Sequence, residues 1–365
     1  SCITNVGTGI RASVMMFLPA LTLSGEVDKI VMAVKQKGLT VRGELGEGSF
    51  PLGYLYQVSN GVSIGLSERE IVSSVTSAVG KIDTLIANGC ECEPYITADD
   101  VLLRTKAEDV LKGIRILGEF LKPQRLVLAI EDNKIVAIEK LQSLKEEYED
   151  IEIVVVPTRY PQGSEKQLIQ AVTGREVPPK GLPHDVNCVV FNVTTLAAVY
   201  EAVVNGTPSI ERIVTVSGEG VNNPQNFIVK VGTPTMDLVK VAGGLKDDVK
   251  FVINGGPMMG TTLSSLLTPI TKATNSILCL NEADELEQKN CIRCGKCLTV
   301  CPMKLQPIYL YKFANTDNFK KLDKLNLIDC IGCGACSYIC PAKLPLTKTF
   351  REYKIKMKEV KAKCN

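Results

Sequence analysis

Two short cysteine runs near the C-terminus carry the clearest chemistry in the sequence. The first is Cys291-Ile-Arg-Cys294-Gly-Lys-Cys297-Leu-Thr-Val-Cys301-Pro302, and the second is Cys330-Ile-Gly-Cys333-Gly-Ala-Cys336-Ser-Tyr-Ile-Cys340-Pro341. Both have the spacing C-x2-C-x2-C-x3-C-P, which is typical of ligands to cubane iron–sulfur clusters. Three thiolates of each run can reach one cluster from a tight turn and the helix that follows it. The sequence therefore predicts two [4Fe–4S] clusters and single-electron transfer.

The fourth ligand of each cluster is expected from the other run, because the helix carries the last cysteine across the module. Structural zinc normally uses separated pairs of ligands, and disulfides would imply an oxidising compartment. Neither alternative explains two identical runs that each end in Cys-Pro. We assign the first cluster to Cys291, Cys294, Cys297 and Cys340, and the second cluster to Cys330, Cys333, Cys336 and Cys301.

The composition is that of an ordinary globular protein. The 365 residues carry a net charge of +2 with 22% charged residues, so the net charge alone indicates no binding to nucleic acid. Eight of the 14 cysteines lie in the two runs and no secretory signal leads the chain, which favours the cytoplasm. The most apolar stretch, residues 12–23, is too short for a membrane span. We expect any role at a membrane to be played from its surface.

Residues 65–206 alternate between strands and helices. The expected strands are 82–86, 125–130, 151–156 and 187–192, and the expected helices are 67–78, 98–121, 133–148, 165–173 and 195–204. This alternation predicts an α/β domain with an open, largely parallel, Rossmann-like sheet that has helices on both faces. Ligands of such sheets bind outside the carboxyl ends of the strands.

Three loops at those predicted strand ends are rich in polar residues. They cover residues 88–100, 158–166 and 192–195. The third loop opens a helix whose N-terminal N–H groups would suit an anion such as phosphate. Each loop alone can be interpreted as a capped turn. Together, beside two iron–sulfur motifs, they favour a flavin and nucleotide pocket.

These segments resemble the RnfC family, the C subunits of Rnf electron-transport complexes, which is itself similar to the flavin-binding subunit of respiratory complex I. The resemblance covers residues from about 67 to the C-terminus. It rests on the two cysteine runs and on Asn88-Gly-Cys-Glu-Cys-Glu-Pro-Tyr-Ile-Thr-Ala-Asp-Asp100, Tyr160-Pro-Gln-Gly-Ser-Glu165, Asn192-Val-Thr-Thr-Leu-Ala197 and Gly255-Gly-Pro-Met-Met-Gly260.

The resemblance implies a peripheral subunit on the cytoplasmic side of the cell membrane that binds FMN and NADH. Electrons would pass through the two clusters, inside a complex that couples NAD and ferredoxin chemistry to ion translocation. Its partners would be the other subunits of an Rnf-type complex, NAD(H) and, indirectly, ferredoxin. Flavin carries the hydride chemistry, so no acid–base pair of side chains is expected. The residues implied in FMN and nicotinamide binding are Asn88, Glu91, Glu93, Gly163, Glu165, Asn192 and Thr195.

One family element is missing from its usual place. The family has a glycine-rich G-x-G-G-x-x-F-P loop shortly before the first polar loop, whereas residues 73–83 lead into the predicted strand without it. Residues 46–51, Gly-Glu-Gly-Ser-Phe-Pro, match it in part but lie well upstream, where a β-turn is the alternative. Two other hypotheses therefore stay open. One is a soluble RnfC-like electron carrier for another reductase, of the proline reductase or corrinoid reductase type, and the other is a flavin-free relay of two clusters.

Five regions are expected along the chain. They are a β-rich region at 1–64, the α/β domain at 65–206, a small β-grasp (SLBB-like) domain at 207–262, a linker at 263–285 and an α-helical two-[4Fe–4S] ferredoxin-like domain at 286–365. The β-grasp domain is implied by the resemblance. Residues 348–363 are expected to form a basic helix, either solvated or docking an acidic partner or a membrane face. Gly255–Gly260 lacks the Gly-Lys-Ser/Thr ending of a P-loop and is expected to be a structural connection between domains.

Overall fold

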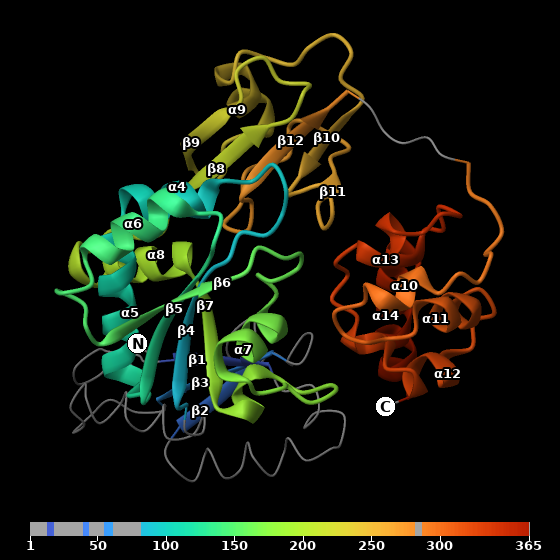
Figure 1. The fold of residues 1–365 in the computed structure, drawn as a ribbon, viewed down its shortest axis with the longest axis horizontal. Coiled ribbons are helices and arrows are strands. Elements are labelled where there is room, and N and C mark those ends of the chain that lie inside the picture. The colour runs from blue at the N-terminus through green and yellow to red at the C-terminus, as the bar shows by residue number, and fades with distance from the viewer. Residues whose placement is uncertain (1–12, 18–38, 44–54, 61–81, 282–286, 365) are drawn as a thin grey trace. The chain divides into compact units, whose positions relative to one another are not determined.

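The computed structural model describes residues 13–17, 39–43, 55–60, 82–281 and 287–364 (Figure 1). The helix expected at 67–78 and the segment 46–51 lie outside the described residues. The chain divides into two compact units. The first comprises Ser1–Leu85, Arg115–Arg125 and Asn187–Val189, and the second comprises Ile86–Ile114, Leu126–Val186 and Val190–Asn365.

Short strands are present in the N-terminal region, as expected. They are β1 (Ser13–Phe17), β2 (Leu39–Gly43) and β3 (Leu55–Asn60). β3 is the central strand and pairs antiparallel with both neighbours. The region therefore contains a three-stranded antiparallel sheet.

The α/β domain is built on a four-stranded sheet in the order β6-β5-β4-β7. Its strands are β4 (Thr84–Gly89), β5 (Arg125–Glu131), β6 (Ile151–Val156) and β7 (Cys188–Asn192). β5 and β6 pair in parallel, with Leu126 opposite Ile151. The order puts the first and last strands side by side, so the direction of winding reverses between β4 and β7. Open α/β sheets bind ligands at this kind of reversal.

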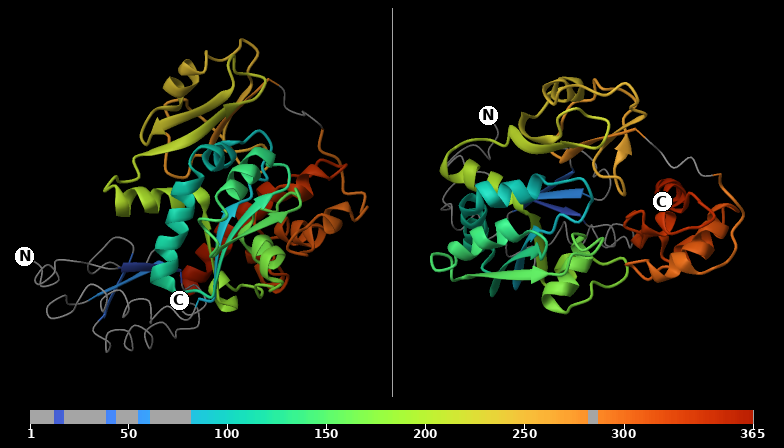
Figure 2. Two further views of the ribbon diagram at one scale, coloured as in Figure 1. Left: turned by 60° about the vertical axis from the view of Figure 1, so that its left-hand side comes forward. Right: turned by 45° about the horizontal axis from the view of Figure 1, so that its top comes forward.

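Helices lie on both faces of this sheet, as predicted. α7 lies on one side and α5 on the other (Figures 1 and 2). The helices described in this domain are α4 (Ala98–Thr105), α5 (Ala107–Leu121), α6 (Ile135–Ser143), α7 (Glu165–Thr173) and α8 (Val193–Val204). The prediction of one helix over 98–121 is wrong, because α4 ends at Thr105 and the next residue, Lys106, has a non-helical φ of −133°. The break lets α4 pack against α6 and α8.

A second sheet has the order β11-β10-β12-β8-β9. Its strands are β8 (Glu211–Ser217), β9 (Gln225–Lys230), β10 (Phe251–Asn254), β11 (Thr261–Thr262) and β12 (Ser276–Leu280), and α9 (Thr235–Val241) contributes Leu238 and Val239 to the same core. β12 pairs with both β8 and β10 in the middle of the sheet. The linker expected at 263–285 is therefore wrong over 276–280, because the buried apolar strand completes the β-grasp core.

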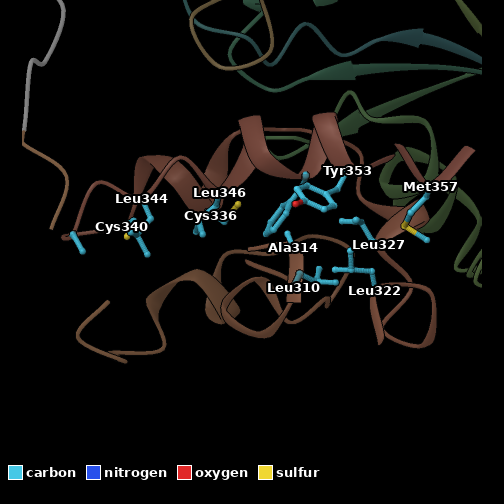
Figure 3. Packing of buried hydrophobic residues seen from close by; sticks show 12 residues of the cluster. Leu310, Ala314, Leu322, Leu327, Cys336, Cys340, Leu344, Leu346, Tyr353 and Met357 are labelled. Carbon is cyan, nitrogen blue, oxygen red and sulfur yellow. The ribbon is translucent and has the colours of Figure 1, made fainter. Parts of the chain in front are cut away.

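The C-terminal domain is helical, as expected. It contains α10 (Lys296–Thr299), α11 (Pro307–Ala314), α12 (Phe319–Lys324), α13 (Ala335–Tyr338) and α14 (Leu346–Cys364). Figure 3 shows its core, in which Leu310, Leu322 and Leu327 lie near one another and Cys336 and Cys340 lie beside Leu346 and Leu344. In the part of the chain that the structure describes, no helix is both long enough and apolar enough to cross a membrane.

Candidate functional site

Each of two cavities in the helical domain is lined by four cysteines drawn from both runs. The first cavity has a volume of about 480 Å³, and the second is much smaller, about 20 Å³. Both runs enter a short helix, α10 or α13, directly after a glycine. The cysteines of the first cavity are Cys291, Cys294, Cys297 and Cys340, and those of the second are Cys301, Cys330, Cys333 and Cys336.

The donor sets of both cavities fit iron–sulfur clusters. All eight cysteines are free of disulfides. Among the described residues, no three His, Cys, Asp or Glu side chains converge on a point that could hold a single metal ion. Cluster ligands need not converge in this way, because several iron and sulfide atoms lie between them. The backbone N–H of Leu305 donates to the sulfur of Cys301 at 3.3 Å, and N–H donors to sulfur are one of the means by which proteins tune such clusters.

The first two polar loops of the α/β domain contact one another directly. Asn88 donates through its side-chain nitrogen to the carbonyl of Gly163 at 2.9 Å and accepts from the N–H of Cys90 at 3.0 Å. A Cβ atom on Gly163 would collide with the carbonyl oxygen of Cys90. Glycine is therefore required at this position by the approach of one loop to the other.

Glu91 is a buried residue of the first loop, and its carboxylate forms hydrogen bonds with the start of α4. Its carboxylate accepts from the N–H groups of Asp99 at 2.9 Å and Asp100 at 3.3 Å, and Lys134 lies 3.5 Å away. Burial, followed by repulsion from Asp99, raises the pKa of Glu91 to about 7. This carboxylate therefore acts as the cap of α4, although Thr97 occupies the formal N-cap position.

This pKa predicts how stability depends on pH. A pKa above the unfolded value of 4.5 means that the folded protein binds more protons between about pH 4.5 and 7, so the stabilising contribution of Glu91 is complete below pH 4.5 and is lost as the pH rises towards 7. Glu91→Gln removes this titration. We expect the difference in unfolding free energy between wild type and variant to fall across that window and to stay level above it. Urea unfolding at a series of pH values measures this difference, and a level difference throughout would contradict the assignment.

The third loop opens α8 beside the first loop. Asn192 caps the helix by accepting from the N–H of Thr194 at 2.8 Å, and it donates to Asp99 at 2.7 Å. Thr194 also donates to Asp99, at 3.0 Å. Thr195 is exposed in the first turn of α8. The helix N-terminus and the Thr195 hydroxyl are thus available to an anion.

Glu93 links the first loop to the turn between β10 and β11 by hydrogen bonds. Its carboxylate accepts from the N–H groups of Met258 at 3.2 Å and Met259 at 2.7 Å. A Cβ atom on Gly256 would displace the Glu93 carboxylate, so the glycine leaves room for that side chain. Gly255–Gly260 was expected to connect two domains, but it is the turn between β10 and β11 of one sheet. This turn is held by Glu93, a residue of the predicted flavin site.

The second loop reaches the second cysteine run. The hydroxyl of Tyr160 donates to the carbonyl of Cys333 at 2.6 Å. Lys166, at the start of α7, lies 3.8 Å from Asp329, and the side-chain nitrogen of Gln167 lies 3.4 Å from the carbonyl of Pro302. The residues around the second cavity thus contact the loop that was predicted to bind flavin. Glu165 itself is exposed at the first position of α7.

Sequence reasoning gave no individual role to three residues at this edge of the sheet. Asp99 links the first and third loops, and Lys134 accompanies Glu91. Glu131 ends β5, is fully buried, and has no hydrogen-bond partner for either carboxylate oxygen within the described residues. Burial raises the pKa of Glu131. The sequence signal that could have identified Glu131 is its position as a charged residue directly after the apolar run 126–130.

Comparison with protein families finds three domain types in the order expected from the sequence, which is an FMN-binding domain, an SLBB domain and a cluster-binding domain. A family described as the Nuo51 FMN-binding domain matches residues 69–201, the SLBB domain matches 213–262, and a 4Fe-4S dicluster domain matches 290–344. Residues 1–85 match a different family, described as the C-terminal catalytic domain of ATP:guanido phosphotransferase. The FMN-binding and cluster-binding domain types expected from the sequence are therefore confirmed.

Three curated relatives are similar over most of the chain. The C subunit of the ion-translocating oxidoreductase complex of Haemophilus influenzae is 42% identical over 80% of this chain and 44% of its own length. The protein of the same name from Pseudomonas aeruginosa is 46% identical over 78% of this chain and 37% of its own. The C subunit of the proton-translocating ferredoxin:NAD(+) oxidoreductase complex of Clostridium ljungdahlii is 42% identical over 66% of this chain and 53% of its own length.

The chain thus spans about half, or less, of the length of these curated relatives. A solved NAD+-reducing [NiFe]-hydrogenase is 19% identical with a TM-score of 0.49, over 94% of this chain and 56% of that chain. The matched domains follow one another in the order that the resemblance implied. From the α/β domain to the C-terminus, the chain belongs to the RnfC family of C subunits of Rnf ion-translocating electron-transport complexes, which is related to the FMN-binding subunit of complex I.

Proposed function

We propose that this chain is an electron-transfer subunit that passes electrons between NAD(H) and partner redox centres by way of FMN and two [4Fe–4S] clusters. The observation that carries the proposal is the pair of cavities, each lined by three cysteines of one run and the fourth of the other. Under this proposal Cys291, Cys294, Cys297 and Cys340 hold the first cluster, and Cys330, Cys333, Cys336 and Cys301 hold the second. Both sets match the spacing rule for two-cluster ferredoxins.

The residues at the carboxyl edge of the α/β sheet fit a flavin mononucleotide. Thr195 and the first turn of α8 would hold its phosphate. The unpartnered carboxyl of Glu131 lies at the end of β5, which is separated from β7 by β4. The remaining flavin and nicotinamide contacts are proposed for Asn88, Glu91, Glu93, Gly163, Glu165 and Asn192. When bound, FMN accepts two electrons with a hydride and releases them singly, a conversion that no side chain here could perform.

The biological setting is proposed from the relatives. The curated relatives are named as subunits of ion-translocating complexes, and that of Clostridium ljungdahlii names ferredoxin and NAD(+). We infer that this chain is a peripheral subunit on the cytoplasmic side of the membrane, with other subunits of an Rnf-type complex as partners and ferredoxin reached indirectly.

A second candidate function is a relay of two clusters without flavin. It is favoured by the sequence between 73 and 83, which lacks the glycine-rich loop, and by Asn88 and Gly163, which already contact each other across the loops. A soluble carrier that serves another reductase would share the same clusters.

Cofactor content tests the proposal. The full chain is purified anaerobically, and its iron, sulfide, flavin and NADH-dependent bleaching are measured. The proposed function requires about eight irons, one FMN per chain and bleaching by NADH. The same iron content without flavin would leave only the relay, and the absence of iron would refute both.

A further inference from the structure

Tyr95 has an unusual backbone conformation for a bulky residue. It lies near the end of the first polar loop, in the left-handed region with a φ of 68°. A large residue seldom adopts this conformation, which persists only where the surrounding structure enforces it. The side chain is 47% exposed, so burial does not hold Tyr95 in place.

Hydrogen bonds to the end of β8 and to the turn after it hold Tyr95 instead. The hydroxyl of Ser217 donates to the carbonyl of Tyr95 at 2.8 Å, and the hydroxyl of Tyr95 donates to the carboxylate of Glu219 at 2.8 Å. The second bond raises the pKa of Tyr95 and lowers the pKa of Glu219, so it is intact at neutral pH. The backbone and the side chain of Tyr95 are thus both bound to the β-grasp domain.

The same domain holds the loop on either side of Tyr95. Before it, the carboxylate of Glu93 accepts from two N–H groups of the turn between β10 and β11. After it, the N–H of Thr97 donates to the hydroxyl of the buried Thr215 at 3.1 Å, and Asn226 of β9 donates to the hydroxyl of Thr97 at 2.9 Å. The end of the first loop is therefore bound to the β-grasp domain at three successive places.

These contacts extend to the phosphate site that we propose at α8. Thr97 directly precedes α4, and α4 packs against β8 (Figure 1). Asp99, in the first turn of α4, accepts from Asn192 and Thr194 at the start of α8. A shift of residues 95–97 would therefore move Asp99 and, through it, the first turn of α8.

We propose that the β-grasp domain forms part of the flavin site, and that Tyr95 is the positioning residue through which it holds the first polar loop in the conformation that binds FMN. The inference deepens the proposed function and rests on it. A domain that only separated the α/β domain from the clusters would need no fixed contact with this loop and no strained tyrosine. A flavin site does need them, because a loop that is ordered before binding loses less conformational entropy when the ligand binds.

Tyr95→Phe tests the proposal, because it keeps the ring and removes only the hydroxyl group. FMN release from the full chain is followed anaerobically by the rise in flavin fluorescence after dilution. We expect about fivefold faster release, which is the typical effect of losing one hydrogen bond. Hydrogen exchange of residues 93–97 should also be faster than in the wild type. Tyr309→Phe is the matched control, since Tyr309 is 49% exposed but lies on α11, and it should release FMN at the wild-type rate.

Variants of Glu219 distinguish a positioning role from general destabilisation. Glu219→Gln keeps an acceptor oxygen for the Tyr95 hydroxyl and should release FMN much as the wild type does, whereas Glu219→Ala should behave like Tyr95→Phe. The two losses should not add in Tyr95→Phe/Glu219→Ala, because both variants break the same hydrogen bond.

Two kinds of failure can be told apart. Release of FMN at the wild-type rate by both Tyr95→Phe and Glu219→Ala, or losses that add in full in the double variant, would overturn the role of Tyr95. Wild-type protein that binds no FMN would instead refute the proposed function, and this inference with it.

Discussion

Cys340→Ala is expected to remove the first cluster and leave the second in place, although Cys340 belongs to the second run. The first cavity is lined by Cys340 together with three cysteines of the first run. Iron should fall from about eight towards about four atoms per chain, because a cubane cluster is held by four thiolates and is destabilised when one of them is removed. Iron analysis and the EPR spectrum of the dithionite-reduced protein measure the loss.

Cys301→Ala is the matched variant. Cys301 lies in the first run but lines the second cavity, so its loss should remove the second cluster and leave the first. The remaining cluster can be identified from its surroundings, because Cys291 and Cys294 are exposed whereas Cys333 and Cys336 are buried. A soluble paramagnetic relaxing agent should broaden the EPR signal of Cys301→Ala more than that of Cys340→Ala. The reverse order would show that each run holds its own cluster.

Local sequence patterns predicted the elements whose signals are complete within a few residues. β6 at 151–156 and α7 at 165–173 have the predicted bounds, since each is an apolar pattern bounded by turn residues. The predicted helix over 98–121 hid a break at Lys106, because helical propensity does not register that α4 must turn to pack against α6 and α8. β12 was taken for linker because its partners, β8 and β10, lie far from it in sequence along the chain.

In the candidate site, too, local motifs could be predicted from the sequence and long-range contacts could not. The cysteine runs are local motifs, and their spacing could be interpreted directly. The contacts of Glu93 with Met258 and of Tyr160 with Cys333 join residues more than 160 positions apart, so no local pattern could reveal them. The family comparisons also bear on the stretch that lacks the glycine-rich loop. Residues 73–83, where an RnfC chain would have that loop, lie within both the match to the ATP:guanido phosphotransferase family and the match to the Nuo51 FMN-binding domain.

Gly163→Ala is expected to separate the first two polar loops and to lower flavin retention. The added methyl group would collide with the carbonyl oxygen of Cys90 and lie 3.3 Å from the sulfur of Cys92. The Asn88–Gly163 hydrogen bond of 2.9 Å would lengthen as the loops move apart. Overpacking of this kind typically costs about 1–3 kcal/mol. We therefore expect faster hydrogen exchange in residues 86–95 and a flavin-to-protein ratio below that of the wild type.

Gly174→Ala is the control because it strains the backbone without touching the loops. Gly174 ends α7 with a φ of 73°, and a Cβ atom there would meet no other atom within 4 Å. Its expected cost is about 1 kcal/mol, from the left-handed conformation alone, and flavin retention should stay at the wild-type level. Flavin loss in both variants would point to general destabilisation. If Gly163→Ala exchanges faster but keeps its flavin, the contact between the loops shapes the domain without forming part of the flavin site.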